Sequence, residues 1–246
     1  MKNRNFLSLV VVSALVLMSG CNSSTSGNGG APSASSELPS EVQLAISTST
    51  STLSQKLSNT LSYMGNEERL AYDVYNYLYK RFGTKQFTNI ATNSEYKHIT
   101  AVQELVRKYK LDDKVAFTNV DLTSLGYVNT PIESMKAGSY DIAKIQKLYD
   151  DLTSQGSSSE VEALKVGCVI EVVDVDDLNT NIAIAESEKA TDVVTVFNFL
   201  RDGSYNHYWS FDKGLKNNGV TNGCCTWTDL CHPEYPQNSN GGNGRK

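Results

Sequence analysis

The sequence predicts an all-α protein, in which the main domain is a four-helix bundle and a long crossover carries an extra short helix. Two observations favour this fold class. Four stretches repeat apolar residues at alternating spacings of three and four, which places those residues on one face of a helix. Each of the four apolar stripes is also interrupted by carboxylate, imidazole or hydroxyl side chains. Because such groups are costly to bury alone, we expect them to share a polar centre.

The first 20 residues, 1–20, have the pattern of an export signal rather than of a folded element. Lys2 and Arg4 precede an apolar run over 6–18, and small residues follow it. This run is too short for a good membrane-spanning helix. We therefore expect residues 1–20 to be a signal peptide that is removed from the mature protein.

The segment 17–21 resembles a bacterial lipobox, with Met where Leu is commoner. The resemblance implies cleavage before Cys21 and a lipid on its sulfur; the alternative is a plain secretory signal with an incidental cysteine. Residues 21–52 are rich in Ser, Thr and Gly, so we expect a flexible tether there. Together these features predict a bacterial cell-envelope protein, periplasmic or on the outer surface, held at a membrane by its N-terminal lipid.

The helical domain is expected to cover residues 53–215. Its first helix is predicted over 53–82 and ends at Gly83, a residue suited to the left-handed position after a helix. The apolar stripe of this helix contains Glu68 as its one charged residue. The first helix therefore brings one carboxylate to the expected polar centre.

A second helix is predicted over 88–110, with Thr88 or Asn89 as its N-terminal cap. The link from the first helix is short, so the two should be antiparallel neighbours. Glu95 and His98 interrupt the stripe and lie one turn apart on the same face. A Glu-x-x-His pair that points into a bundle is how carboxylate-bridged di-metal sites are built.

The rest of the domain repeats this logic. Residues 111–138 read as a mostly irregular crossover, followed by an extra amphipathic helix over 139–155. The third bundle helix starts after the serines at 157–159, and its stripe contains Glu171 and Asp174.

The fourth helix is predicted over 188–213, with Ser204 and His207 on its stripe. Only three histidines occur in the chain, and His98 and His207 both fall on these stripes. This placement is the strongest indication that the polar breaks are not random.

Residues 216–246 are expected to form an irregular, cysteine-containing tail. An exported protein lives where disulfides persist, and four cysteines besides Cys21 allow three pairings. We expect one bridge within the tail, from Cys231 to Cys224 or Cys225. Cys168 is expected to be a small residue of the core.

Charge and motifs exclude some functions. The formal net charge is −5, acidic and basic residues are mixed, and no basic stripe with interleaved aromatic residues is present. Nucleic acid is therefore not an expected partner. The sequence also contains no Gly-rich phosphate loop and no Gly-x-Ser-x-Gly nucleophile motif.

Iron, manganese and zinc accept carboxylate oxygen and imidazole nitrogen as ligands. A bridged pair of such ions needs several carboxylates, because each carboxylate offsets positive charge and can span both ions. The candidate metal ligands are Glu68, Glu95, His98, Glu171, Asp174 and His207. The alternative is a structural network of buried ion pairs and hydrogen bonds without metal.

The order of these residues resembles the ferritin-like superfamily, and rubrerythrin-type domains in particular. It is closest to an uncharacterised ferritin-like family, domain of unknown function 2202. The resemblance covers roughly residues 58–212 and rests on the runs 67–75, 94–98, 163–167, 170–171 and 203–207. The fourth helix departs from the superfamily pattern, because Ser204 stands where a Glu is expected. The departure leaves three alternatives: Asp174 compensates, a single metal binds, or water fills the gap.

The resemblance implies a di-iron centre, with manganese or zinc as alternatives, that oxidises iron or reduces oxygen or peroxide. Glu67 and Tyr75 would then support the ligands from outside the centre. The tail lacks the paired Cys-x-x-Cys motifs of a rubredoxin-type module, so an electron donor would be external. The sequence is also compatible with a homo-oligomer. The alternative from a different class is a non-catalytic envelope protein that binds metal or makes protein contacts.

Overall fold

The computed structural model describes residues 37–111, 136–140 and 142–237, and in these residues the protein is all-helical, without strands. The predicted all-α class is therefore confirmed. The elements are α1 (Ser40–Ser47), α2 (Gln55–Phe82), α3 (Lys85–Ile90), the π-helical turn η1 (Ala91–Glu95), α4 (Tyr96–Lys108), α5 (Ala143–Gly156), α6 (Glu160–Ser187), α7 (Thr191–Asn217), and the 3₁₀ turns η4 (Gly223–Thr226) and η5 (Thr228–Leu230). The predicted signal peptide, Cys21 and most of the predicted crossover lie outside the described residues.

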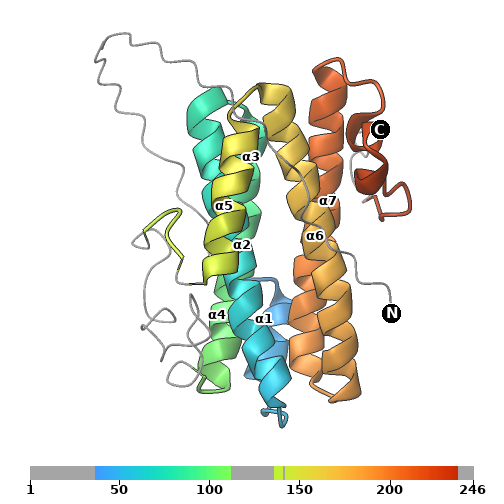
Figure 1. The fold of residues 1–246 in the computed structure, drawn as a ribbon. Helices are drawn as coiled ribbons and strands as arrows, with labels where there is room; N and C mark the ends of the chain where they lie inside the picture. Colours follow the sequence, from blue (N-terminus) through green and yellow to red (C-terminus); the bar gives the residue numbers. More distant parts are fainter. Residues whose placement is uncertain (1–36, 112–135, 141, 238–246) are drawn as a thin grey trace. The chain divides into compact units, whose positions relative to one another are not determined.

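Four long helical segments lie side by side in this helical bundle, as Figure 1 shows: α2, the continuous run α3–η1–α4, α6 and α7. The helix α5 lies against α2 and α6. Two groups of buried apolar side chains occupy the interior, one toward each end of α2. Within the part of the chain that the structure describes, no helix is both long and apolar enough to cross a membrane.

The first link is shorter than the sequence suggested. Gly83 ends α2 in the left-handed region, with φ 72°, and its N–H donates to the carbonyl of Tyr79, as predicted for this position. The next helix, however, begins at Lys85, so the prediction of Thr88 or Asn89 as its cap was wrong. Thr84 precedes that helix and donates its hydroxyl hydrogen bond to Glu160. The two-residue link therefore turns the chain straight back.

The π-helical turn η1 ends at Glu95 and was not predicted. A π-turn accommodates an extra residue, and such turns are frequent at functional sites. Residues on both sides of the turn remain buried, including Ile90, His98 and Val102. The turn therefore keeps the predicted stripe directed into the bundle while it changes the helical register just before His98.

The later helices begin close to their predicted positions. Ser159 caps α6 through its side chain, which accepts a hydrogen bond from the N–H of Glu162. The predicted fourth helix starts three residues later than expected, because residues 188–190 form the turn out of α6, with Lys189 at φ 58°. It also continues to Asn217, four residues beyond the predicted end.

The predicted tether is wrong in its last part. Residues 40–47 form α1, which packs against α4 and α7. Leu38 and Val42 are buried, and Lys108 donates to the carbonyl of Ala45. Leu38, just before the helix, and Val42 within it anchor this short segment on the bundle, although the surrounding composition is that of a linker.

The tail is also more ordered than predicted. It folds back on α7 and α6 through η4 and η5 (Figure 1). Disulfides join Cys168 to Cys224 and Cys225 to Cys231. The second bridge is one of the two tail pairings that the sequence left open. Cys168 is buried as expected, but the expectation that it is a simple core residue was wrong, because it anchors the tail to α6.

Candidate metal centre

The six candidate metal ligands meet inside the bundle. They come from four different helical segments, so no local sequence motif holds the whole set. All six side chains are buried. They are Glu68 on α2, Glu95 at the end of η1, His98 on α4, Glu171 and Asp174 on α6, and His207 on α7.

Glu95 lies between the two histidines. Its Oε2 is 3.1 Å from Nδ1 of His98, and its Oε1 is 3.1 Å from Nδ1 of His207. One carboxylate therefore directs a separate oxygen at each imidazole. The two imidazole rings lie with centroids 5.6 Å apart.

Each histidine has a second carboxylate at the same nitrogen. Nδ1 of His98 is 2.9 Å from Oε2 of Glu68, and Nδ1 of His207 is 3.3 Å from Oε2 of Glu171. Two groups of potential ligands result, Glu68–Glu95–His98 and Glu95–Glu171–His207, and the ligand atoms within each group lie within 4.8 Å of one another. The two groups share Glu95, which is the arrangement that a carboxylate bridging two metal ions requires.

The carboxylates of the centre differ in their pKa values. Burial raises the pKa of Glu68 and Glu171 above the usual range, and burial together with Glu171 raises the pKa of Asp174 to about 7. Burial also acts to raise the pKa of Glu95, but its contacts with the two histidines outweigh burial and lower it. Glu95 is therefore the carboxylate of the centre that is most strongly kept ionised.

The histidines respond in the opposite direction. Burial alone lowers the pKa of His207, but the carboxylates of Glu171 and Glu95 raise it to about 10. The same balance, with Glu68 as the main partner, raises the pKa of His98 well above its usual value. In the metal-free protein, protons on the two imidazoles thus supply positive charge among the carboxylates.

Several buried atoms of the centre are left without a hydrogen bond. Among the described residues, Oε1 of Glu68, Oε2 of Glu67 and Nδ1 of His207 have no hydrogen-bond partner of good geometry. Leaving a buried polar atom unsatisfied costs about 1–3 kcal/mol. Unpaired carboxylate oxygens beside imidazole nitrogens are the donor set that a divalent cation satisfies, so the residues present fit a metal centre.

A second ring of side chains holds the carboxylates. The phenol of Tyr75 donates to Oε1 of Glu171, and the hydroxyl of Ser204 donates to Oδ2 of Asp174. Asp174 is close to the centre but belongs to neither three-residue group. Ser204 therefore fixes the orientation of this neighbouring carboxylate beside the centre. Glu67 is buried beside the centre but is likewise outside both groups.

Three residues around His98 were missed by sequence reasoning. A Cβ atom on Gly203 would lie 2.4 Å from Nε2 of His98, so only glycine leaves room for the ring. Ser94 Oγ lies 3.4 Å from the same nitrogen, and the ring of Phe199 packs edge-on against the imidazole. Gly203 did carry a signal, because a glycine inside a helix costs about 1 kcal/mol relative to alanine and calls for an explanation.

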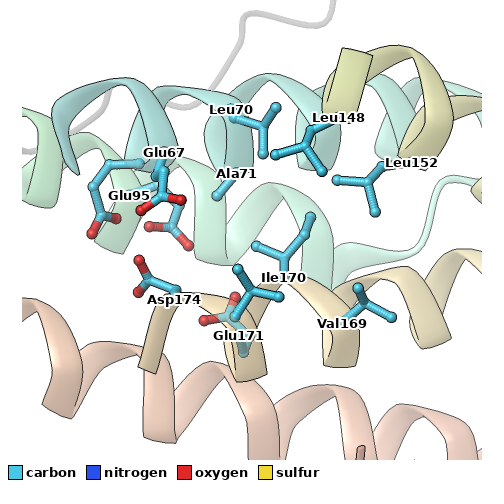
Figure 2. A pocket seen from close by; sticks show the side chains of 12 residues that line it. Glu67, Leu70, Ala71, Glu95, Leu148, Leu152, Val169, Ile170, Glu171 and Asp174 are labelled. Carbon is cyan, nitrogen blue, oxygen red and sulfur yellow. The ribbon is translucent and has the colours of Figure 1, made fainter. Parts of the chain in front are cut away.

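A cavity of about 60 Å³ reaches the centre between α2, α5 and α6. Figure 2 shows carboxylates, including Glu95 and Asp174, at one end of it and aliphatic side chains, including Leu148 and Leu152, at the other. Neither histidine lines the cavity. The cavity therefore approaches the centre from its carboxylate side.

Comparisons with known proteins show the family to which the chain belongs. The chain is 35% identical over 167 residues to the uncharacterized protein MJ0754 of Methanocaldococcus jannaschii, a match that covers 68% of this chain and 79% of that protein. The crystal structure of the hypothetical protein MJ0754 matches with a TM-score of 0.59 at 34% identity, over 70% of this chain and 87% of that one. The family model described as an uncharacterized protein domain, DUF2202, matches residues 58–227, which include all six candidate ligands. The chain therefore belongs to the DUF2202 family.

Proposed function

We propose that this protein is a ferritin-like di-metal protein whose buried centre holds two iron ions. The observation that carries the proposal is the position of Glu95, which directs one oxygen toward each histidine and belongs to both ligand groups. The order of Glu68, Glu95–His98, Glu171 and His207 along four packed segments supports the ferritin-like assignment.

The density of buried carboxylates supports more than one cation. Glu68, Glu95 and Glu171 belong to the ligand groups, and two further carboxylates, Glu67 and Asp174, are buried beside them and would offset positive charge when ionised. The donor set of carboxylate oxygens and imidazole nitrogens suits iron, and manganese and zinc are the alternatives. Binding would replace the protons on the imidazoles by metal at Nδ1.

The activity that we propose is oxidation of ferrous iron, with dioxygen or peroxide as the oxidant. When bound, a pair of ferrous ions supplies two electrons, which with two protons convert dioxygen to hydrogen peroxide. The chain contributes the geometry: Glu95 spans both positions, Glu68 and Glu171 complete one position each, and Tyr75 fixes the orientation of Glu171. Repeated turnover would require either that fresh Fe(II) replaces the oxidised ions or that an external electron donor reduces them.

The location of this activity is proposed from the sequence alone. Export and a lipid on Cys21 would hold the folded domain at the surface of a membrane in the cell envelope. A Cys21→Ser variant should lose the mass of the lipid from the mature N-terminus.

A second candidate function is non-catalytic metal binding or a purely structural centre. It is favoured by the contacts of 2.9 to 3.3 Å that already join carboxylates and imidazoles without metal. The test is to load the full chain with Fe(II) under anaerobic conditions, add dioxygen, and measure the hydrogen peroxide formed. The proposed activity predicts close to one peroxide per two irons oxidised, lost in Glu95→Gln; a non-catalytic centre predicts no oxidation beyond that of free iron.

A further inference from the structure

We propose that the cavity between α2, α5 and α6 is a binding site for dioxygen beside the metal centre. The inference rests on the proposed function and assigns one of its oxidants, dioxygen, to a specific cavity beside the centre. It is argued from the size of the cavity, from its lining and from its position relative to the ligands.

The size of the cavity limits its occupant. Its volume of about 60 Å³ is well below the roughly 300–1,000 Å³ of pockets that hold drug-sized ligands. It has room for a few molecules of the size of water. Val173, which lines the cavity, is 42% exposed, so a small molecule can reach it from solvent. A diatomic molecule fits this space, whereas an extended organic substrate does not.

The lining of the cavity favours an apolar molecule over a polar or charged one. Away from the carboxylates the wall is aliphatic, and none of its side chains offers a hydrogen bond. It is formed by Leu70, Ala71, Leu148, Leu152, Val169, Ile170 and Val173. A hydrated cation that entered here would lose hydrogen bonds without replacement. An aliphatic wall offers no hydrogen bond to water and favours small apolar guests such as xenon. Dioxygen is both small and apolar, and it is the oxidant of the proposed reaction.

The position of the cavity completes the argument. Its polar end is lined by five carboxylates, those of Glu67, Glu68, Glu95, Glu171 and Asp174. Glu67, Glu95 and Asp174 lie together at one end in Figure 2. The histidines, which hold the other side of the centre, do not line it. A molecule in the cavity therefore meets the carboxylate face of the centre. The helix α5 contributes none of the six ligands but supplies Leu148 and Leu152 to the wall, so its role here is to shape the site.

Xenon is the probe that tests the site without depending on iron. Crystals of the full chain under xenon pressure should show xenon beside Leu148, Leu152 and Ile170, with or without metal. A Leu152→Phe variant should exclude it. A wild-type cavity that takes up no xenon would overturn the proposal and leave the di-metal function standing.

Stopped-flow oxidation of the iron-loaded full chain tests delivery. Val173→Trp at the exposed rim, where folding is least at risk, and Leu152→Phe should each slow the reaction with dioxygen by about tenfold. Their Fe(II) content should not change. Lys147→Trp is the control, because Lys147 is exposed on α5 and does not line the cavity.

The outcomes separate the two proposals. Normal iron content with undiminished rates in both cavity variants would overturn the dioxygen site alone. A wild-type protein that binds no iron would overturn the di-metal function and this inference with it, whatever the xenon result.

Discussion

Gly203 on α7 lies so close to His98 that a Cβ atom at this position would be 2.4 Å from Nε2 of the imidazole. The ring is thus held from behind by α7 while its Nδ1 faces Glu68 and Glu95. Contacts at the other edge of a metal-ligating imidazole fix the orientation of its ring. The absence of a side chain at Gly203 is therefore needed for the position of the His98 ring.

Replacing Gly203 by alanine should displace His98. In an unconstrained helix the change would stabilise by up to about 1 kcal/mol. Here we expect destabilisation by about 1–3 kcal/mol from overpacking, together with a loss of bound metal. Chemical denaturation and metal analysis measure both. Asp202→Ala, at an exposed neighbouring position, is the control and should keep wild-type metal content. A Gly203→Ala protein that is more stable and binds normal metal would contradict this account.

Removing the phenol oxygen of Tyr75 should weaken metal binding without unfolding the protein. The Tyr75 ring packs against Phe87 and Phe211, and phenylalanine keeps those contacts. The loss of the hydrogen bond to Glu171 should lower metal affinity by about 10–100-fold. Competition titration with a chelator measures the affinity. Tyr77→Phe, which removes a hydroxyl from an exposed position, should have no effect, and equal affinities in the two variants would argue against a supporting role for Tyr75.

The stability of the metal-free protein should fall as pH rises from neutral to alkaline values. The folded pKa of His207 is about 10, above its ordinary value of 6.5, so its contribution is complete below pH 6.5 and is lost as pH approaches 10. Asp174 acts in the same sense at lower pH, because its raised pKa of about 7 makes ionisation between pH 3.8 and 7 unfavourable for the fold. Thermal unfolding in the presence of a chelator, from pH 6 to 10, measures the slope.

The fall in stability with rising pH should be smaller in His207→Gln, because this variant lacks the imidazole that titrates. Metal affinity of the wild type should rise with pH, because metal competes with protons at Nδ1. His232, which is partly exposed and pairs with Glu234 in the tail, offers the matched control His232→Gln. A slope that is unchanged by His207→Gln would show that the imidazole is not protonated in the metal-free fold.

The two disulfides should contribute unequally to stability. Cys168 and Cys224 are 56 residues apart in sequence, whereas Cys225 and Cys231 are 6 apart. In the chain-entropy account the larger loop stabilises by about 4 kcal/mol and the smaller by about 2 kcal/mol. Denaturation of the two double-alanine variants compares them. Neither change should alter metal content, and equal losses would contradict the chain-entropy account for this fold.

The sequence anticipated the helices and the residues that meet, because both depend on periodicity. Apolar stripes with polar breaks placed Glu68, Glu95 and His207 on inward faces, and the structure brings them together. What periodicity could not show are features that depend on contacts distant in sequence. The close approach of Gly203 to His98, and the bridge between Cys168 and Cys224, exist only once the helices have packed.

Two further differences have local causes that composition hides. The π-turn before His98 inserts a residue without interrupting the apolar stripe, so no spacing rule reveals it. The helix α1 lies in a segment with the composition of a linker, and it folds because Leu38 and Val42 find a surface on the bundle. In both cases tertiary packing outweighs the local pattern.

The most direct test of the shared carboxylate is the metal content of the full chain. After anaerobic loading with Fe(II), the wild type and a Glu104→Gln control, altered on the exposed face of α4, should each bind about two irons per chain. Glu95→Ala/His98→Ala should bind none, since Glu95 belongs to both ligand groups. A double variant that keeps one iron would show that Glu95 serves a single position, and a wild type that binds no metal while folded would show that the centre is structural.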